Sequence, residues 1–258
     1  MKMTVGELYK ALEEKYPRSL SCSWDNDGMM VCPDPDAEVK RVLVALDATA
    51  KALDHAVNGG FDVVVTHHPM LFRGLKSISP KSVHGRHVLK ALQNGITVLS
   101  FHTRLDAAEG GVNDALCGAL KLQPDGVFGD EEAPTLGRLA TLDPPVTAGK
   151  LAERLKTEFG FPMVRLNGDP DRLVKRLAVC GGDGKDFIYP ALSAGADVFL
   201  TGDAGYNMAG EAAEDGIVTL EAGHYHTEFP VCYVLADVIR HLTGAEVGIF
   251  ESCTYTVL

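Results

Sequence analysis

The stretch FDVVVTHHPMLF, residues 61–72, is the part of the sequence that best predicts how the chain folds. Strand-forming residues run directly into two adjacent histidines, His67 and His68, and a proline follows them. Adjacent residues on an extended chain point to opposite faces, so we expect one imidazole to be buried if the other is exposed. A cluster of metal ligands can use both imidazoles, whereas an apolar core uses neither comfortably.

The composition is typical of a globular protein without a membrane span. The chain has 258 residues, of which 46% are hydrophobic and 23% charged, enough for one large or two modest domains. No apolar run approaches the ~20 residues that a transmembrane helix requires. The first segment, MKMTVGELYKALEEKYP, carries acidic residues and a helical apolar period, which is not the pattern of a signal peptide. We therefore expect a cytoplasmic protein.

Charge and cysteine usage exclude several functions. A formal net charge of −11 argues against binding nucleic acid, which needs clustered Lys and Arg. It does not exclude a nucleotide, because a bound metal supplies local positive charge. The six cysteines form no Cys-x-x-Cys pair, so we expect reduced thiols and no zinc finger.

Hydrophobic periodicity predicts alternating strands and helices along almost the whole chain. Helices are expected at 4–16, 49–60, 83–95, 111–122, 147–160, 186–195, 206–216 and 227–244. Strands are expected at 41–48, 62–68, 96–102, 137–142, 163–166, 176–181, 197–203, 217–224 and 246–250. Several strands are continuous apolar runs without alternation, which is typical of parallel sheets covered on both faces. The predicted fold class is α/β, with two related lobes and largely parallel sheets.

The turn-rich, acidic segment QPDGVFGDEEAPT, residues 123–135, is the expected boundary between these lobes. It places the first lobe at residues 1–125 and the second at 126–258. We expect the segment around 224–258 to be able to pack against the first lobe.

The two halves also resemble each other. AVNGGFDVVVTHH (56–68) aligns with ALSAGADVFLTGD (191–203), and ITVLSFHTRLD (96–106) aligns with IVTLEAGHYHTE (217–228). Strand–helix–strand units share such patterns without common descent. A His-x-x-x-acid motif at the end of both later segments favours an internal duplication over that simpler explanation.

Histidines gather where strands are predicted to end. Four of the nine lie at three strand exits: His67, His68, His102 and His224. In open α/β sheets the carboxyl ends of strands are where ligands bind. The remaining helical histidines, His55, His84, His87 and His241, are expected to be structural.

Two of these histidines are followed four residues later by a carboxylate. Asp106 follows His102 and Glu228 follows His224, a spacing that places both side chains on one helical face if the chain is helical there. Imidazole together with carboxylate suits Zn, Fe, Mn or Ni better than Ca or Mg. Because three such clusters exceed the needs of one ion, we expect two ions bridged by a carboxylate.

The sequence also resembles the Nif-three-like family, whose members are hexameric proteins with a dinuclear metal centre, often described as GTP cyclohydrolase I type 2 homologues. The matching blocks occur in family order and cover essentially the whole chain. They are SWDNDGMMV (23–31), VLVALDAT (42–49), DVVVTHHPMLFRGLKSI (62–78), FHTRLDAAEGGVNDAL (101–116), LAVCGGDGKDFI (177–188), DVFLTGD (197–203) and EAGHYHTE (221–228).

The resemblance implies a dinuclear site in the crevice between two α/β lobes. In that arrangement His67 and His68 each hold one of two divalent transition-metal ions. Asp106, His224 and Glu228 complete the pair, with Glu228 as the bridge. The resemblance also implies a homohexamer.

Two further histidines have open roles. His102 matches the family's HT-x-x-D block and is either a ligand or a residue that orients a ligand. His226, between Tyr225 and Thr227, matches no family position, and a bystander role is the simpler interpretation. Either histidine, if not a ligand, is a candidate for moving protons in catalysis.

Other motif residues have two interpretations each. Trp24, Asp25 and Asn26 either line a substrate pocket or form a capped turn. Asp47 and Thr49 either face a substrate or cap the next helix.

The later motifs are similarly ambiguous. GGDGK (181–185) is either an anion cradle or, more simply, a glycine turn. Asp203 aligns with His68 in the duplication and is expected to face the site.

Together these features favour a metal-dependent hydrolase that acts on a nucleotide-like or phosphoester substrate through a metal-activated water. The alternative is a non-enzymatic, metal-loaded hexamer that acts as a binding or regulatory protein. A catalytic metal site keeps open coordination positions, whereas a structural site is closed by protein ligands. Five or six protein ligands for two ions favour catalysis.

Overall fold

A computed structural model of the protein describes residues 3–258, and these form two compact units. The first contains the chain up to Leu105 together with Cys232–Thr254, and the second contains Asp106–Val231 with Tyr255–Leu258. The division lies within the short helix α4 (Thr103–Ala107), earlier than the turn-rich segment that the sequence suggested as a boundary. That segment instead begins with strand β5 (Pro124–Phe128), which belongs to the sheet of the second unit.

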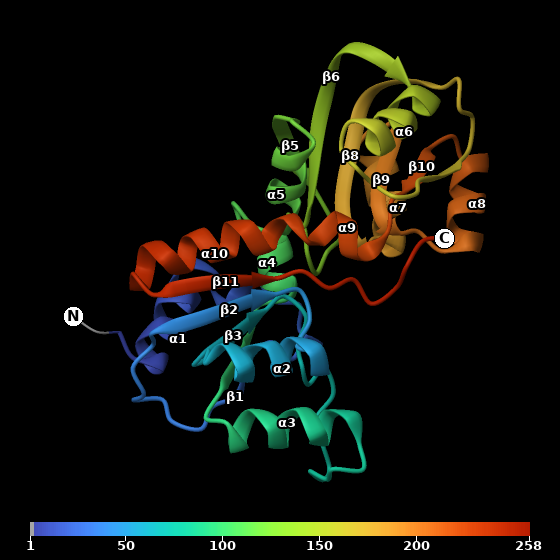
Figure 1. The fold of residues 1–258 in the computed structure, drawn as a ribbon. Helices are drawn as coiled ribbons and strands as arrows, with labels where there is room; N and C mark the ends of the chain where they lie inside the picture. The colour runs from blue at the N-terminus through green and yellow to red at the C-terminus, as the bar shows by residue number, and fades with distance from the viewer. Residues whose placement is uncertain (1–2) are drawn as a thin grey trace. The chain divides into compact units, whose positions relative to one another are not determined.

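The first unit is built on a five-stranded sheet with the order β1-β4-β3-β2-β11. Its strands are β1 (Gly28–Val31), β2 (Arg41–Ala45), β3 (Val63–Thr66), β4 (Thr97–Ser100) and β11 (Glu246–Phe250), and its helices are α1 (Val5–Lys15), α2 (Ala50–Gly59), α3 (Val83–Gln93) and most of α10 (Pro230–Thr243). All neighbours are parallel except β1, which pairs antiparallel with β4. Helices α2 and α3 lie on one side of the sheet and α10 on the other (Figure 1).

Local sequence explains these elements. Thr4 caps α1 in a capping box with Glu7, and the Thr49 side chain accepts a hydrogen bond from Ala52 at the start of α2. Every residue of β3 and β4 is buried, as expected for strands covered on both faces. The core beneath α2 and α3 includes Leu43, Leu53, Val64, Val88, Ile96 and Val98.

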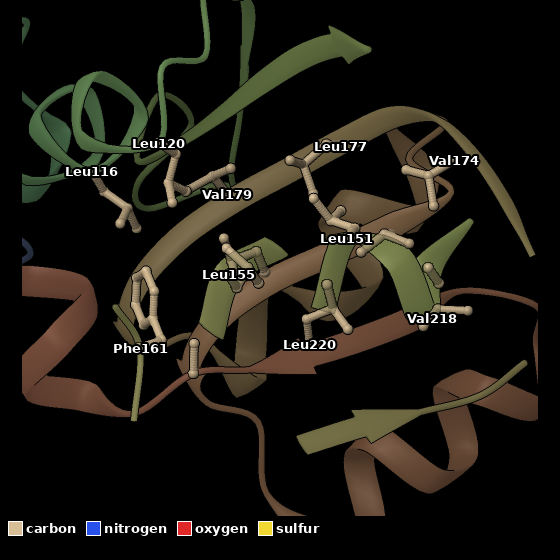
Figure 2. Packing of buried hydrophobic residues seen from close by; sticks show 14 of the residues in the cluster. Leu116, Leu120, Leu151, Leu155, Phe161, Val174, Leu177, Val179, Val218 and Leu220 are labelled. Carbon is tan, nitrogen blue, oxygen red and sulfur yellow. The ribbon is translucent and has the colours of Figure 1, made fainter. Parts of the chain in front are cut away.

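The second unit contains a six-stranded sheet with the order β5-β6-β8-β9-β10-β7. Besides β5, its strands are β6 (Gly137–Thr147), β7 (Arg165–Asn167), β8 (Leu173–Asp183), β9 (Val198–Asp203) and β10 (Val218–Glu221), and its helices are α5 (Val112–Ala119), α6 (Ala148–Thr157), α7 (Ile188–Ser193), α8 (Tyr206–Glu214) and α9 (His224–Glu228). The central strands β8, β9 and β10 are parallel, and the outer strands are antiparallel. Figure 2 shows the leucines of α5 and α6 packed with Leu177, Val179 and Leu220 of this sheet.

The two units repeat one another in detail. The order α1, β1, β2, α2, β3, α3, β4, α4 in the first matches α6, β7, β8, α7, β9, α8, β10, α9 in the second. Asp62 accepts hydrogen bonds from two successive backbone N–H groups at the start of β2, and Asp197 does the same early in β8. The N–H groups of Gly6 and Gly149 each donate to a proline carbonyl at 2.8 Å. Generic strand–helix physics does not require these matching side-chain bonds, so the structure supports an internal duplication.

The strand register corrects one detail of the sequence alignment. Thr97 lies opposite Val63 and Val218 lies opposite Val198, which makes Thr97 and Val218 equivalent. Counting forward, His102 corresponds to Gly223, and His224 falls one residue later. The two His-x-x-x-acid motifs are therefore not equivalent positions, although both lie where a strand leads into a short helix.

Among residues 3–258, no helix combines the length and apolar character needed to cross a membrane.

Candidate metal-binding site

Three imidazoles converge in the first unit. His67 and His68 follow β3 directly, and His102 follows β4, the neighbouring parallel strand. One ring nitrogen of each lies within 4.8 Å of those of the other two. The ring centroids are 4.9 Å apart for His67 and His68, 5.2 Å for His67 and His102, and 5.7 Å for His68 and His102. The predicted gathering of histidines at the carboxyl ends of strands is present within this unit.

Carboxylates orient two of these rings. The Nδ1 atom of His68 lies 2.8 Å from Oδ1 of Asp47, and Nδ1 of His102 lies 3.0 Å from Oδ1 of Asp25. An ionised carboxylate only accepts, so each histidine donates from Nδ1 and, when neutral, carries its lone pair on Nε2. Asp47 thus faces the candidate site, which was one of the two roles considered for it, and Thr49 takes the capping role.

A backbone carbonyl orients the third ring. Nδ1 of His67 lies 2.9 Å from the carbonyl oxygen of Phe101, and the whole residue is 0% exposed. The side chain of His68 is 23% exposed, so the two adjacent imidazoles differ in burial as the extended chain predicted. Because Nδ1 is engaged in all three rings, Nε2 is the atom with which each would bind a metal. An acceptor on the second nitrogen is the usual arrangement around metal-binding histidines.

Asp25 is fixed by its surroundings as an ionised carboxylate. Burial alone would raise its pKa, but hydrogen bonds from His102 and Thr103 lower that pKa to about 2. One oxygen accepts from His102, and the other accepts from the backbone N–H and the hydroxyl of Thr103, at 3.0 and 2.6 Å. Asp25 therefore stays charged at any pH well above 2 and holds the proton of His102 on Nδ1.

Replacing Asp25 tests this orienting role. We expect Asp25→Asn to weaken transition-metal binding by roughly 10- to 100-fold, because an amide has one oxygen and cannot accept hydrogen bonds from both His102 and Thr103, so that it holds the imidazole tautomer less firmly. Competition with a chromogenic chelator measures the change. Asp54→Asn, which alters an exposed aspartate paired with Lys90, is the matched control and should bind metal normally. Equal affinities for the two variants would contradict the assignment.

A second group of candidate ligands lies in the second unit, on α9. Nε2 of His224 is 3.2 Å from Oε2 of Glu228, one helical turn away. The predicted spacing of four on a helical face is confirmed for this pair. Nδ1 of His224 lies 2.7 Å from Oδ2 of Asp203, so this ring also has a carboxylate on its other nitrogen. Asp203 contacts a candidate ligand, in agreement with its expected site-facing position.

Glycines in GGDGK make room for the Glu228 carboxylate. Gly182 has φ of +67°, and a Cβ there would overlap Oε1 of Glu228. A Cβ at the neighbouring Gly181 would lie 3.5 Å from Cγ of the same side chain. Close approach of Glu228, together with the positive φ, therefore explains Gly182, whereas the contact with Glu228 at Gly181 is an ordinary van der Waals distance. The sequence signal was present, but it did not indicate which side chain needed the space.

The same region carries negative charge. Burial raises the pKa of the Cys180 thiol, and the nearby charges of Asp106 and Glu228 raise it further. Asp106 lies in the first turn of α4, and Glu228 is only 4% exposed. Carboxylates held in a buried region repel one another unless a cation or a proton neutralises them. A divalent cation bound there would supply that neutralisation.

His226 lies on a different face of α9 from the candidate ligands. Residues two apart on a helix point roughly 200° apart, so His226 faces away from both His224 and Glu228. Its Nδ1 is 3.2 Å from the Tyr255 hydroxyl, and its ring centroid is 6.5 Å from that of Phe161. Burial lowers its pKa. This placement favours a packing role over proton transfer at the candidate site.

The donor sets fit a transition metal. The first unit offers imidazoles whose orientation is fixed, and the second offers an imidazole with carboxylates (His67, His68 and His102; Asp106, His224 and Glu228). Nitrogen with carboxylate oxygen is the donor chemistry of Zn, Fe, Mn and Ni rather than of Ca.

Comparison with known proteins gives a consistent result. Residues 3–256 match the family model described as Duf34/NIF3 (NGG1p interacting factor 3). A Clostridium acetobutylicum protein named GTP cyclohydrolase 1 type 2 homolog is 32% identical over 249 residues, covering 95% of this chain and 91% of its own. A Schizosaccharomyces pombe protein named Protein NIF3 homolog is 31% identical over 239 residues, covering 86% and 84%.

Solved structures show the same fold. A crystal structure of a hypothetical protein from Staphylococcus aureus superposes with a TM-score of 0.92 at 25% identity, covering 100% of both chains. The resemblance inferred from the sequence blocks is thereby confirmed, and the chain belongs to the Duf34/NIF3 family.

Proposed function

We propose that this protein binds two divalent transition-metal ions and hydrolyses a phosphoester or nucleotide-like substrate. The observation that carries the proposal is the convergence of His67, His68 and His102, each with Nδ1 held by an acceptor within 3.0 Å. A structural role alone does not require three imidazoles with one ring nitrogen of each within 4.8 Å of those of the other two.

The two ligand groups have complementary chemistry. The group of the first unit consists of imidazoles, whereas that of the second contains carboxylates. Following the family resemblance, we propose that His67 and His68 would each hold one ion and that Asp106, His224 and Glu228 would complete the coordination. Glu228 has the longer carboxylate side chain and is assigned as the bridge.

When bound, two such ions polarise a phosphoryl oxygen and lower the pKa of a bound water toward neutrality. The chain's own residues supply the orientation of the ligands. Asp47 and Asp203 hold the rings of His68 and His224, so that these rings do not need to reorganise during the reaction. Asp25 keeps a proton on Nδ1 of His102, which leaves Nε2 as the atom that would bind an ion, as in the other two rings.

A turnover screen tests the proposal. Purified protein loaded with Zn, Mn, Fe or Ni is assayed on phosphoesters, nucleotides and cyclic amides, beside the Glu228→Gln variant and chelator-treated protein. We expect hydrolysis of at least one class, lost in both controls and restored to the chelated protein by metal. Equal activity in the wild type and the variant would remove this site from consideration. Metal binding without turnover on any class would favour a binding or regulatory role instead.

We further propose a homohexamer, as the family resemblance implies. Light scattering of the purified protein should give a mass about six times that of one chain. A concentration-independent monomer mass would contradict this prediction.

A further inference from the structure

Two exposed aromatic side chains stand beside the imidazole group of the first unit. Trp24 is 55% exposed and Phe72 is 45% exposed, although both are large apolar rings. We propose that Trp24, Phe72 and His102 form a recognition surface for a planar nitrogen heterocycle, the base of a nucleotide. This inference rests on the proposed function, because it names the substrate class that the same site would take.

The three rings form one cluster. The ring centroids of Trp24 and Phe72 are 5.9 Å apart, and each lies 6.2 Å from the centroid of His102. All three pairs are edge-on, with interplanar angles of 61°, 73° and 85°. Edge-to-face packing of this kind leaves aromatic faces for a further ring. A base stacks on such a face regardless of its identity, because every base has a π-face.

Hydrogen bonds also hold the two chain segments that carry Trp24 and Phe72. The side-chain amide of Asn26 donates to the carbonyl of Leu71, which joins the segment of Trp24 to that of Phe72. Asp25, next to Trp24, is buried and hydrogen-bonded to His102 and Thr103. Two rings on segments fixed in this way are pre-organised, so binding a ligand orders little of the chain.

The position of His102 favours a small ligand over a protein partner. His102 belongs both to the aromatic cluster and to the group of three imidazoles. A base on the aromatic rings therefore places its attached sugar phosphate near the candidate metal ligands. Arg73 directly follows Phe72 and Lys76 comes four residues after it, and both are exposed, so this segment carries positive charge that suits an anionic group. A flat heterocycle with an anionic arm matches these features together.

Trp24 is the only tryptophan in the chain, so tryptophan fluorescence, excited at a wavelength that tyrosine does not absorb, reports on this surface alone. The metal-loaded protein is titrated with guanosine 5′-monophosphate, with ribose 5-phosphate as the ring-free probe, and with guanosine as the phosphate-free probe. We expect the monophosphate and guanosine to quench Trp24 saturably and ribose 5-phosphate to leave its emission unchanged. Phe72→Ala should weaken binding of the monophosphate by about tenfold or more.

Tyr233→Ala is the matched control, because Tyr233 is an aromatic residue of the same unit with a similar exposure of 48%. It should bind the monophosphate as the wild type does. Calorimetry extends the test to Trp24 itself, with Trp24→Ala expected to lose the affinity and Trp24→Phe to keep most of it. Thermal unfolding checks that each variant is folded.

Three outcomes would overturn the inference. They are quenching by ribose 5-phosphate equal to that by the monophosphate, equal affinities for the Phe72 and Tyr233 variants, and emission that changes with protein concentration but not with nucleotide. The last would assign the surface to a second copy of the chain. Nucleotide binding without turnover of any substrate class would leave this inference standing while the proposed hydrolase function failed.

Discussion

The Glu228→Gln variant should purify with one metal ion or fewer per chain, whereas the wild type should carry about two after reconstitution. The side chain of Glu228 is 5% exposed and lies 3.2 Å from Nε2 of His224. As the proposed bridge it contributes to both ions, so its loss should affect both. Elemental analysis of protein dialysed against trace metal measures the stoichiometry.

Stability provides an independent readout of the same change. A ligand that binds only the folded protein stabilises it by about 2.7 kcal/mol at 100 times its Kd. Metal should therefore raise the melting temperature of the wild type and have little effect on Glu228→Gln. Without metal the variant should be at least as stable as the wild type, because a neutral amide removes a buried charge close to that of Asp106.

Glu221→Gln is the matched control for this prediction. Glu221 is also buried in the second unit, at 6% exposed, but it pairs with Arg165 and belongs to none of the candidate ligand groups. It should lose some stability and keep its metal. The prediction is wrong if Glu228→Gln retains two ions per chain, or if Glu221→Gln loses them equally.

The sequence predicted those parts of the structure that depend on local pattern. Uninterrupted valines predicted the buried strand β3, and the histidines that follow it were correctly assigned to the carboxyl end of a parallel sheet. Strand β5 was missed because its Asp and Gly are typical of turns. As an edge strand it pairs on one side only and lacks an apolar run.

The sequence could not predict the hydrogen bonds that orient the candidate ligands, because these bonds join residues far apart in the chain or involve the backbone. His102 meets Asp25 across 77 positions of the chain, and His67 binds a backbone carbonyl that no residue type identifies. Gly182 was visible as a glycine, but its contact with Glu228 depends on how β8 and α9 pack. Periodicity indicates that elements form, and it does not indicate which side chains meet when they pack.

Arg104→Met should destabilise the first unit by about 3 to 5 kcal/mol, the largest stability effect that we expect from one substitution outside the candidate ligands. Arg104 is 0% exposed, yet its guanidinium is paired on every side. Nε and Nη2 donate to the two carboxylate oxygens of Asp27 at 2.7 and 3.0 Å, and Nη1 donates to Glu13 and to the carbonyl of Tyr16. Burial opposes the charge, but Asp27 and Glu13 raise the pKa of Arg104 on balance.

The loss of stability arises mainly because the substitution leaves the carboxylate of Asp27 buried without its charged partner. The side chain of Asp27 is also 0% exposed, and methionine offers it no hydrogen bond in place of two charged ones. Arg18 and Ser21 still contact Asp27, which should keep the loss within the stated range rather than above it. Arg104→Lys keeps the charge without the paired geometry and should fall between the wild type and the methionine variant.

Urea denaturation followed by circular dichroism measures these differences, with the transition of the first unit analysed separately if two are seen. Arg240→Met is the matched control, since Arg240 makes a surface ion pair with Asp237 in the same unit and should change stability by about 1 kcal/mol or less. Similar losses for the two methionine variants would refute the assignment.

The Arg104–Asp27 pair also connects stability to the candidate site. Asp27 accepts a hydrogen bond from the backbone N–H of His102 at 3.2 Å, so the same carboxylate that neutralises Arg104 fixes the point where β4 ends. Arg104→Met should therefore weaken metal binding as well as the fold, whereas Arg240→Met should leave metal binding unchanged. The double variant Asp27→Asn/Arg104→Met separates the two roles of the pair. If it regains stability without regaining metal affinity, the Arg104–Asp27 pair positions His102 independently of its contribution to the stability of the fold.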